Sequence, residues 1–337
     1  MKVTVLGAGS WGTALSVLLD GKGHEVRTWE FFPEAVEALN RDRENRKMLP
    51  GVPIPESILI TNDMSEAMEG AEILLFVVPT TAVRPTAEKA ASRVEGSPVV
   101  ANAGKGIERG TGARISQILE KELPDRFSGH TVTLSGPSHA EEVSRGMPTT
   151  IVAASPDRAA AETVQRAFST ETLRVYTNID QVGVELAGSL KNVIAVAAGV
   201  LDGLGFGDNS KGALMTRGLA EIGRLGQEMG ADPLTFAGLS GMGDLITTCI
   251  SRHSRNRNLG EMIGEGLTLD EALSKMVMVA EGVNTVQSTR ELARRHGVEM
   301  PITEAMYQVL FERKRAAGAV QELMTRDLKP ELEHHRG

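Results

Sequence analysis

The chain has 337 residues, 41% of them hydrophobic and 24% charged, and a formal net charge of −8 at pH 7. This length exceeds what one hydrophobic core usually organises, so we expect two domains of an ordinary soluble protein. The negative charge argues against a general nucleic-acid-binding or anionic-membrane surface. Because Cys249 is the only cysteine and the histidines are scattered, the sequence excludes an intramolecular disulfide and favours no structural metal site.

The N-terminus and the apolar segments bear on location. The chain enters a predicted strand directly, without the cleavage-site pattern of a signal peptide, and no apolar run reaches the length of a membrane span. We therefore expect a cytoplasmic protein with no integral membrane segment.

A glycine-rich turn, GAGSWG, follows the first predicted strand at residues 2–6, and residues 13–19 then have a helical apolar pattern. In this G-x-G-x-x-G arrangement Gly7 permits the tight turn, Gly9 lets the backbone approach a pyrophosphate, and Gly12 lets helix and strand pack closely. The N-terminus of the helix adds N–H groups and a positive dipole end. The pattern predicts a dinucleotide site, and a glycine turn that serves only packing is the alternative.

Glu30 bears on which dinucleotide binds. It follows a second predicted strand at residues 25–29 and lies 18 residues after Gly12, where an acidic residue of such sites meets the ribose 2′-hydroxyl. A carboxylate there repels a 2′-phosphate, and the next residues offer no arginine, so the sequence favours NAD over NADP. Phe31 and Phe32 are candidate walls of the adenine pocket, with simple core packing as an equal alternative.

Further apolar runs of strand length alternate with helical segments, as in a doubly wound, mostly parallel sheet. Ligands bind at the carboxyl ends of such strands, so Lys105 is a candidate anion or substrate contact, with a solvated loop lysine as the alternative. The small residues at 135–140 fit either close approach to a ligand or an ordinary turn. The predicted strands lie at residues 73–78, 99–101, 131–134, 150–153 and 173–176, with a helix at about 156–168.

Two segments of this half have less definite patterns. Residues 40–55 are charged and then proline-rich, which is typical of a surface excursion. Residues 108–126 predict an amphipathic helix with Ile115, Ile118 and Leu119 inward and its charged residues in solvent.

Helical periodicity then takes over, and we place the boundary near Asp180, between a dinucleotide-binding domain at residues 1–180 and a helical domain at 181–337. The apolar, small-residue-rich stretch at 186–201 predicts a central buried helix, yet it carries Lys191. Burial lowers the pKa of a lysine and makes it usable for proton transfer near neutral pH. The alternative is a stem packed in the core whose ammonium reaches water or a carboxylate.

Two more segments of the second half carry polar groups. Asp244 lies in a glycine-flanked turn, where it either bonds the local backbone or hydrogen-bonds a substrate hydroxyl. Within residues 251–258, three arginines interleaved with serine and asparagine predict a local anion site, since a guanidinium matches a phosphate. A run of solvated charges is the alternative.

Taken in order, several motifs resemble the bacterial type of sn-glycerol-3-phosphate dehydrogenase over nearly the whole chain. They are GAGSWGTAL at residue 7, NAGKG at 102, SGPSHAEE at 135, GSLKNVIAVAAG at 188, GMGDL at 241, SRN at 254 and EG at 281. The resemblance implies an N-terminal Rossmann domain and an all-α C-terminal domain shared with the 6-phosphogluconate and hydroxyacid dehydrogenases. It also implies a homodimer that transfers hydride between NAD(P)H and dihydroxyacetone phosphate, supplying glycerol 3-phosphate for phospholipid synthesis.

The resemblance also assigns roles to residues. Lys191 matches the proton donor and acceptor, and Asn192 and Thr248 align with polar groups near the substrate. Many bacterial members have an arginine or histidine where this chain has Phe31, which supports the lean toward NAD. Matches to substrate contacts are Lys105, Gly136, Ser138, Lys191, Asp244, Ser254, Arg255 and Asn256. Matches to cofactor contacts, beside the glycine turn, Glu30, Phe31 and Phe32, are Ser10, Trp11, Lys105, Ala140, Arg255, Val279 and Glu281.

The implied chemistry has Lys191 protonate the developing alkoxide, while Arg255 and Asn256 hold the phosphate and Lys105 and Asp244 orient the carbonyl and hydroxyl groups. Two alternatives remain open. One is a hydroxyacid or 6-phosphogluconate type of dehydrogenase, which would prefer a carboxylate substrate. The other is a dinucleotide-sensing protein without catalysis.

Overall fold

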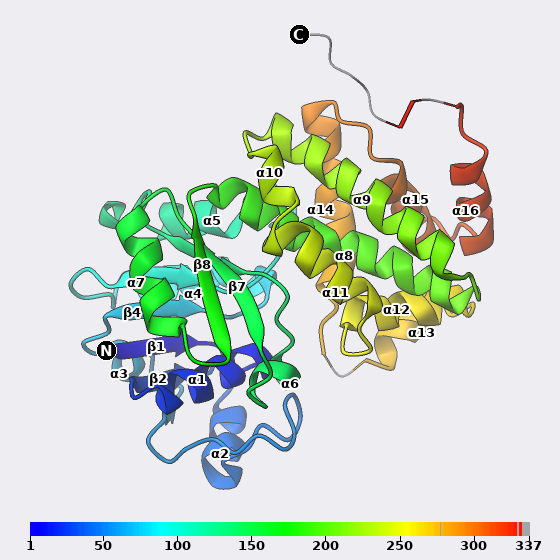
Figure 1. Ribbon diagram of the computed structural model, residues 1–337. Helices are drawn as coiled ribbons and strands as arrows, with labels where there is room; N and C mark the ends of the chain where they lie inside the picture. The colour runs from blue at the N-terminus through cyan, green and yellow to red at the C-terminus, as the bar shows by residue number, and fades with distance from the viewer. Residues whose placement is uncertain (277, 329, 332–337) are drawn as a thin grey trace.

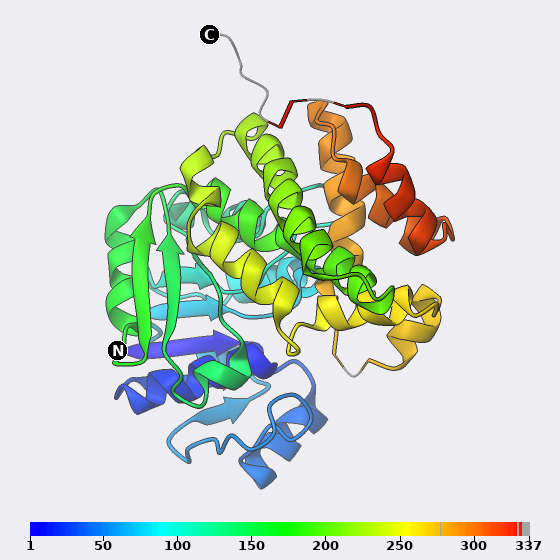
Figure 2. The same ribbon diagram turned by 45° about the vertical axis from the view of Figure 1, so that its right-hand side comes forward.

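The computed structural model describes residues 1–276, 278–328 and 330–331. Figure 1 shows an N-terminal domain built on a sheet and a C-terminal domain of helices, with α8 (Gln181–Gly203) running from the first into the second. Figure 2 shows the same two domains side by side from a second direction. The expected order of a Rossmann domain followed by an all-α domain is confirmed.

The described part of the chain forms one sheet of eight strands in the order β3-β2-β1-β4-β5-β6-β7-β8. Strands β1 to β6 are mutually parallel, whereas β7 is antiparallel to β6 and parallel to β8. The chain order reverses between β1 and β4, and doubly wound sheets bind ligands at such a point. The strands are β1 (Lys2–Leu6), β2 (Glu25–Trp29), β3 (Leu59–Thr61), β4 (Ile73–Phe76), β5 (Val99–Asn102), β6 (Val132–Ser135), β7 (Thr149–Ala154) and β8 (Leu173–Asn178).

Strand β4 is continuously apolar because it is buried on both faces of the sheet. Successive side chains point to opposite faces of the sheet. Ile73 and Leu75 therefore join the core cluster on one face, and Leu74 and Phe76 join the cluster on the other. The helices of this domain are α1 (Ser10–Gly21), α2 (Pro33–Asp42), α3 (Met64–Met68), α4 (Thr80–Ala91), α5 (Ile115–Glu122), α6 (Ala140–Val143) and α7 (Arg158–Phe168).

The C-terminal domain is organised around α8, which is buried along nearly its whole length. Its small residues permit a close crossing with α12: a Cβ added to Gly199 would lie 1.9 Å from the Arg257 carbonyl oxygen, and one added to Gly260 would lie 1.9 Å from that of Val196. The remaining helices are α9 (Asp208–Glu228), α10 (Pro233–Phe236), α11 (Asp244–Ile250), α12 (Arg255–Gly264), α13 (Leu269–Ser274), α14 (Glu281–His296), α15 (Pro301–Phe311) and α16 (Ala316–Met324).

The length of α8 differs from the sequence-based expectation. The sequence predicts no apolar run of membrane length, because the apolar stretch at 186–201 has only 16 residues. The helix has 23 residues and is long and apolar enough to cross a membrane by length and composition. All of its apolar window is buried inside the protein, as in the core helix of a soluble domain. The high mean hydropathy of this stretch therefore corresponds to its burial inside the protein.

Of two expectations about the N-terminal half, the surface excursion at 40–55 is confirmed in part and the helix at 108–126 is wrong. Residues 40–55 pack back onto the glycine turn, because Leu49 and Val52 are buried with Ala14 of α1 and the Asn45 amide donates to the Ala8 carbonyl at 2.8 Å. The helix expected at 108–126 is shorter. It spans only α5, followed by a 3₁₀ turn at Asp125–Phe127.

The reason for the shorter helix is backbone conformation. Gly110 and Gly112 adopt φ values of +86° and +74°, so the chain before α5 is a loop. The inward positions of Ile115, Ile118 and Leu119 are confirmed.

Candidate active site

The glycine turn has the geometry of a phosphate cradle. Gly7 has φ +113°, and a Cβ on Gly12 would lie 1.9 Å from the Gly7 carbonyl oxygen, so neither position tolerates a side chain. A Cβ on Gly9 would meet nothing within 4 Å, which leaves open space at the start of α1. No side chain caps this helix, so the N–H groups of Ser10 and Trp11 in its first turn are available to an anion.

Glu30 lies beside this turn. Its carboxylate accepts hydrogen bonds from the backbone N–H of Ala8 at 3.0 Å and of Phe32 at 3.3 Å. Phe31 and Phe32 are 61% and 53% exposed, which rules out core packing as their role, and their rings meet edge to face with centroids 5.1 Å apart. The Lys89 ammonium of α4 lies 5.9 Å from the Phe31 ring, so a cation is present although no arginine follows Glu30 in the sequence.

The polar cluster at the junction of the domains centres on Asp244. Asp244 is the first residue of α11. Its Oδ1 accepts a hydrogen bond from the Lys191 ammonium of α8 at 2.5 Å, and its Oδ2 accepts one from Lys105 of the β5–α5 loop at 2.6 Å. Lys191 also donates to the Thr248 hydroxyl, and Lys105 donates to the Gly136 carbonyl at 3.0 Å. The sheet domain and the helical domain therefore each contribute a lysine to one carboxylate.

Burial sets the charge states of this cluster. Lys191 is 5% exposed, and burial, assisted by the charge of Lys105, lowers its pKa to about 8 against the opposing effect of Asp244. Burial alone would raise the pKa of Asp244, but the two ammonium groups outweigh it and hold that pKa below its ordinary value. Lys191 is thus poised to exchange a proton near neutral pH, while Asp244 stays ionised.

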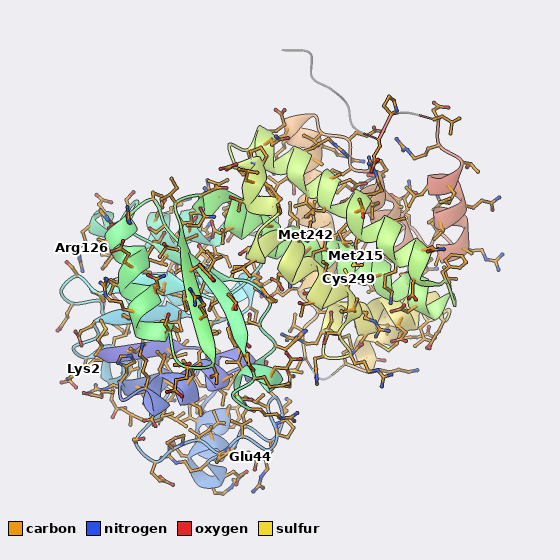
Figure 3. All side chains as sticks on the ribbon, viewed as in Figure 1. Lys2, Glu44, Arg126, Met215, Met242 and Cys249 are labelled. Atoms are coloured by element: carbon orange, nitrogen blue, oxygen red, sulfur yellow. The ribbon has the colours of Figure 1, made fainter. Side chains whose placement is uncertain are left out.

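Cys249 lies near this cluster, on α11 among the helices of the C-terminal domain (Figure 3). Burial raises the pKa of its thiol to about 12. The thiol is therefore protonated and unreactive at physiological pH.

The loop after β6 closes one side of the cluster. Gly136 has φ +134° and presents its carbonyl to Lys105 and to the Ser138 hydroxyl, which donates to it at 3.0 Å. His139 was not predicted as a site residue. Its ring lies 5.8 Å from that of His253, and its Nε2 is buried without a hydrogen-bond partner among the described residues. Burial and the nearby Lys191 charge lower the pKa of His139, which favours the neutral ring.

The predicted anion site is only partly as expected. Ser254 caps α12, accepting a hydrogen bond from the Arg257 N–H at 3.2 Å, and Arg255 is exposed beside it. Asn256 is buried and accepts a bond from the Gly282 N–H at 2.9 Å. Arg257, however, pairs with Asp202 at 2.6 Å and with Glu261 at 3.2 Å. Its guanidinium is occupied within the helical domain and is not a free anion ligand.

The remaining predicted cofactor residues meet at the domain junction. The Arg255 guanidinium donates to the Val279 carbonyl at 3.3 Å, and Glu281, at the start of α14, accepts a bond from the Thr80 N–H at 3.1 Å. Burial raises the pKa of Glu281. Ala140 is buried in the cluster against which Trp11 packs. Among the described residues no group of three or more His, Cys, Asp or Glu side chains could hold a metal.

Comparison with known proteins identifies the family. Residues 2–161 and 180–321 match the family models described as the N-terminus and the C-terminus of NAD-dependent glycerol-3-phosphate dehydrogenase. A glycerol-3-phosphate dehydrogenase [NAD(P)+] of Chlorobium phaeobacteroides is 52% identical over 98% of this chain and 99% of its own length. The chain belongs to the NAD-dependent glycerol-3-phosphate dehydrogenase family.

Further glycerol-3-phosphate dehydrogenases support this family assignment. The enzyme of that name from Bacillus velezensis is 49% identical, over 98% of this chain and 96% of its own length. The crystal structure of the glycerol-3-phosphate dehydrogenase of Coxiella burnetii superposes with a TM-score of 0.92 at 36% identity, covering 96% of this chain and 99% of that one. A D-mandelate dehydrogenase structure, with a TM-score of 0.60 at 13% identity, shares the fold alone.

Several residues that make polar contacts in this family member were not predicted from the sequence. Glu185 directly precedes the apolar stretch that drew attention to Lys191, and a charge at that place in a buried helix was the available signal. Lys89 and Thr80 had no such signal, because only the fold brings them to Phe31 and Glu281.

Proposed function

We propose that Lys191 transfers the proton in the reaction of this family. The chain is an NAD(P)-dependent oxidoreductase that interconverts dihydroxyacetone phosphate and sn-glycerol 3-phosphate, a precursor for phospholipid synthesis. During reduction, Lys191 gives its proton to the oxygen on C2, and during oxidation it removes that proton. The observation that carries this assignment is the buried Lys191 ammonium with a pKa of about 8 on the carboxylate of Asp244.

Hydrogen-bond counting supports a substrate site at both lysines. An ammonium has three N–H donors. Lys191 uses one on Asp244 and one on Thr248, and Lys105 uses one on Asp244 and one on Gly136. Each lysine thus keeps one donor for the substrate. In our proposal, Lys191 contacts the C2 oxygen and Lys105 a neighbouring oxygen, with Gly136 and Ser138 shaping the wall.

The phosphate end lies at the start of α12 in this proposal. Ser254, Arg255 and Asn256 stand at a helix N-terminus, where backbone N–H groups and the helix dipole favour an anion. The exposed Arg255 supplies the guanidinium, while Arg257 is excluded by its pair with Asp202. A chain that carries −8 overall can therefore still bind a phosphate locally.

The dinucleotide fits the opposite side of the junction. The open space at Gly9 and the uncapped first turn of α1 suit a pyrophosphate, Glu30 suits a ribose, and the exposed side chains of Phe31 and Phe32 suit an adenine. When bound, the nicotinamide supplies or accepts the hydride at C2. Residues proposed to flank it are Lys105, Ala140, Arg255, Val279 and Glu281. We further propose a cytoplasmic homodimer with two domains that meet at residue 180.

The first experiment compares initial rates of dihydroxyacetone phosphate reduction at 340 nm with NADH and NADPH in wild type and Lys191→Met. Methionine keeps the buried volume but carries no proton. We expect kcat to fall on the order of 10²–10⁴-fold, the usual contribution of general acid catalysis, with NADH affinity unchanged by fluorescence titration. Retained turnover would remove Lys191 from the chemistry. A small β-hydroxy acid serves as the control substrate, and preferential turnover of it would overturn the substrate assignment.

A further inference from the structure

The β5–α5 loop, residues 103–114, carries Lys105 but is held by the helical domain. From α14, the buried Ser288 hydroxyl donates to the Ile107 carbonyl at 3.1 Å. Arg295 of the same helix donates to the carbonyls of Gly110 and Thr111, each at 2.7 Å. The loop of one domain is thus attached to a helix of the other.

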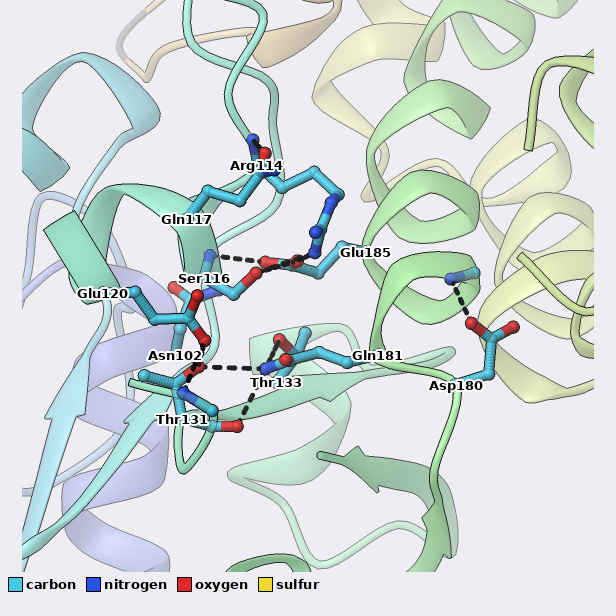
Figure 4. Close-up of polar contacts among 12 residues, drawn as sticks. Asn102, Arg114, Ser116, Gln117, Glu120, Thr131, Thr133, Asp180, Gln181 and Glu185 are labelled. Carbon is cyan, nitrogen blue, oxygen red and sulfur yellow. Dashed lines mark hydrogen bonds and ion pairs between the residues drawn. The ribbon is translucent and has the colours of Figure 1, made fainter. Parts of the chain in front are cut away.

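A second attachment lies at the end of this loop, on α8. The Glu185 carboxylate accepts hydrogen bonds from the Ser116 N–H at 2.8 Å and the Ser116 hydroxyl at 2.6 Å, and it pairs with Arg114 at 2.6 Å (Figure 4). The Glu185 and Arg114 side chains are only 4% and 13% exposed, so solvent screens their attraction weakly. One buried carboxylate therefore fixes the start of α5 and the end of the loop together.

Helix α8 connects this attachment with the proton-transfer group. Glu185 precedes Lys191 by six residues, about 9 Å along a continuous helix. Between them lies Gly188, where an added Cβ would come within 2.4 Å of the Ser135 hydroxyl and 3.9 Å of the Lys105 stem. One turn before Glu185, Gln181 donates to the Thr131 carbonyl at 2.9 Å, as Figure 4 shows. The same helix thus touches the stem of Lys105 and carries Lys191.

We propose that Glu185 is a positioning residue: through Arg114 and Ser116 it fixes the β5–α5 loop on α8 and so holds Lys105 against Asp244. This inference rests on the proposed roles of Lys105 and Lys191 in the reaction. Lys105 reaches Asp244 through a long side chain whose base lies in this loop, where the Thr80 hydroxyl also donates to the Lys105 carbonyl at 3.5 Å. When the loop is released, Lys105 leaves Asp244, and the substrate loses one of its two ammonium contacts.

Release of the loop has a second consequence, at Lys191. The charged and titratable groups that face Lys191 are Asp244 and Cys249 of α11, Lys105, and His139 of the β6–α6 loop. Loss of the positive charge of Lys105 leaves Asp244 to Lys191 alone, which raises the pKa of Lys191. A shift of the pH profile therefore reports the position of Lys105, whereas a merely structural role of Glu185 would leave that profile in place.

The experiment compares Glu185→Gln with the matched control Glu304→Gln. The control breaks the bidentate ion pair with Arg290, which lies within the helical domain and touches neither lysine. For Glu185→Gln we expect kcat for dihydroxyacetone phosphate reduction to fall about tenfold, because small displacements of positioning groups have effects of this size. The KM for NADH stays within about twofold, and the inflection in glycerol 3-phosphate oxidation moves up by about half a pH unit. The control keeps the wild-type kcat and inflection.

A second variant, Arg295→Met, guards against a folding defect, since Arg295 is partly exposed and its loss removes the bonds to Gly110 and Thr111 while the Ser288 bond to Ile107 remains. We expect the same upward shift of the inflection, smaller in size. If both variants keep the wild-type inflection while losing only folded protein, the positioning role is overturned. Failure of the proposed function itself is distinguishable, because Lys191→Met would then stay active and wild type would show no inflection near pH 8.

Discussion

Two buried carboxylates of the helical domain, Asp244 and Glu221, have pKa values shifted in opposite directions. Both are nearly inaccessible to solvent. Asp244 faces two ammonium groups, which hold its pKa below the ordinary value. Among the described residues, Glu221 of α9 accepts hydrogen bonds from the backbone N–H groups of Ile302 at 2.7 Å and Thr303 at 3.4 Å, and burial raises its pKa to about 7.

In our proposal this difference separates a carboxylate of the reaction site, Asp244, from a structural one, Glu221. Burial acts in the same direction on both groups, so the neighbouring charges decide the outcome. At the junction of the domains two lysines from different domains keep Asp244 ionised, and Asp244 in turn accepts a hydrogen bond from each lysine. Glu221 accepts hydrogen bonds from backbone N–H groups at the start of α15, and this role does not need a negative charge.

The largest expected effect comes from removing the charge of Asp244. Asp244→Asn keeps the shape but leaves two buried ammonium groups facing an amide. We expect turnover to fall on the order of 10²-fold or more, because both lysines lose their common anchor. The pKa of Lys191 falls below about 8, so the inflection in glycerol 3-phosphate oxidation moves to lower pH. Steady-state kinetics across pH check both, and an unchanged inflection would contradict the shared-carboxylate account.

Glu221→Gln should instead change stability alone. Because its folded pKa of about 7 is raised above the unfolded value, Glu221 contributes stability that is present below about pH 4.5 and lost as pH rises through 7. Glutamine keeps an acceptor for the N–H of Ile302 and carries no charge at any pH. We expect the variant to gain on the order of 3 kcal/mol over wild type at pH 8 and almost nothing at pH 4.5.

Urea denaturation of both proteins at the two pH values measures this difference. Turnover should match wild type, since Glu221 lies outside the cluster. A constant stability difference across pH would show that folding does not raise the pKa of Glu221, and a loss of turnover would break the contrast with Asp244.

The smallest expected effect is at the cofactor side, where Lys89 adds a charge that no local motif contains. Lys89→Gln removes the ammonium 5.9 Å from the Phe31 ring. We expect the KM for NADPH to rise a few-fold, because a 2′-phosphate loses a nearby cation, and the KM for NADH to stay constant. Parallel titrations with both cofactors test this, and equal changes for the two would place Lys89 outside the 2′-phosphate environment.

The parts that the sequence predicted correctly are those in which local pattern and fold coincide. The GAGSWG turn, the buried β4 and the apolar helix around Lys191 each have a periodicity set by the element itself. The parts that it missed depend on partners far along the chain. Arg257 had the same local context as Arg255, but it lies two residues further along α12, about half a turn, and so faces Asp202 of α8. Nothing near Glu185 in the sequence indicates Arg114 or Ser116.

The account depends most on Lys191 as a group that gains and loses a proton near neutral pH. Oxidation of glycerol 3-phosphate needs the neutral amine and reduction of dihydroxyacetone phosphate needs the ammonium. With the pKa of Lys191 at about 8, kcat/KM for oxidation should rise through that pH and for reduction should fall through it. Both inflections should be absent from the residual activity of Lys191→Met. Inflections that persist unchanged in that variant would contradict the central claim.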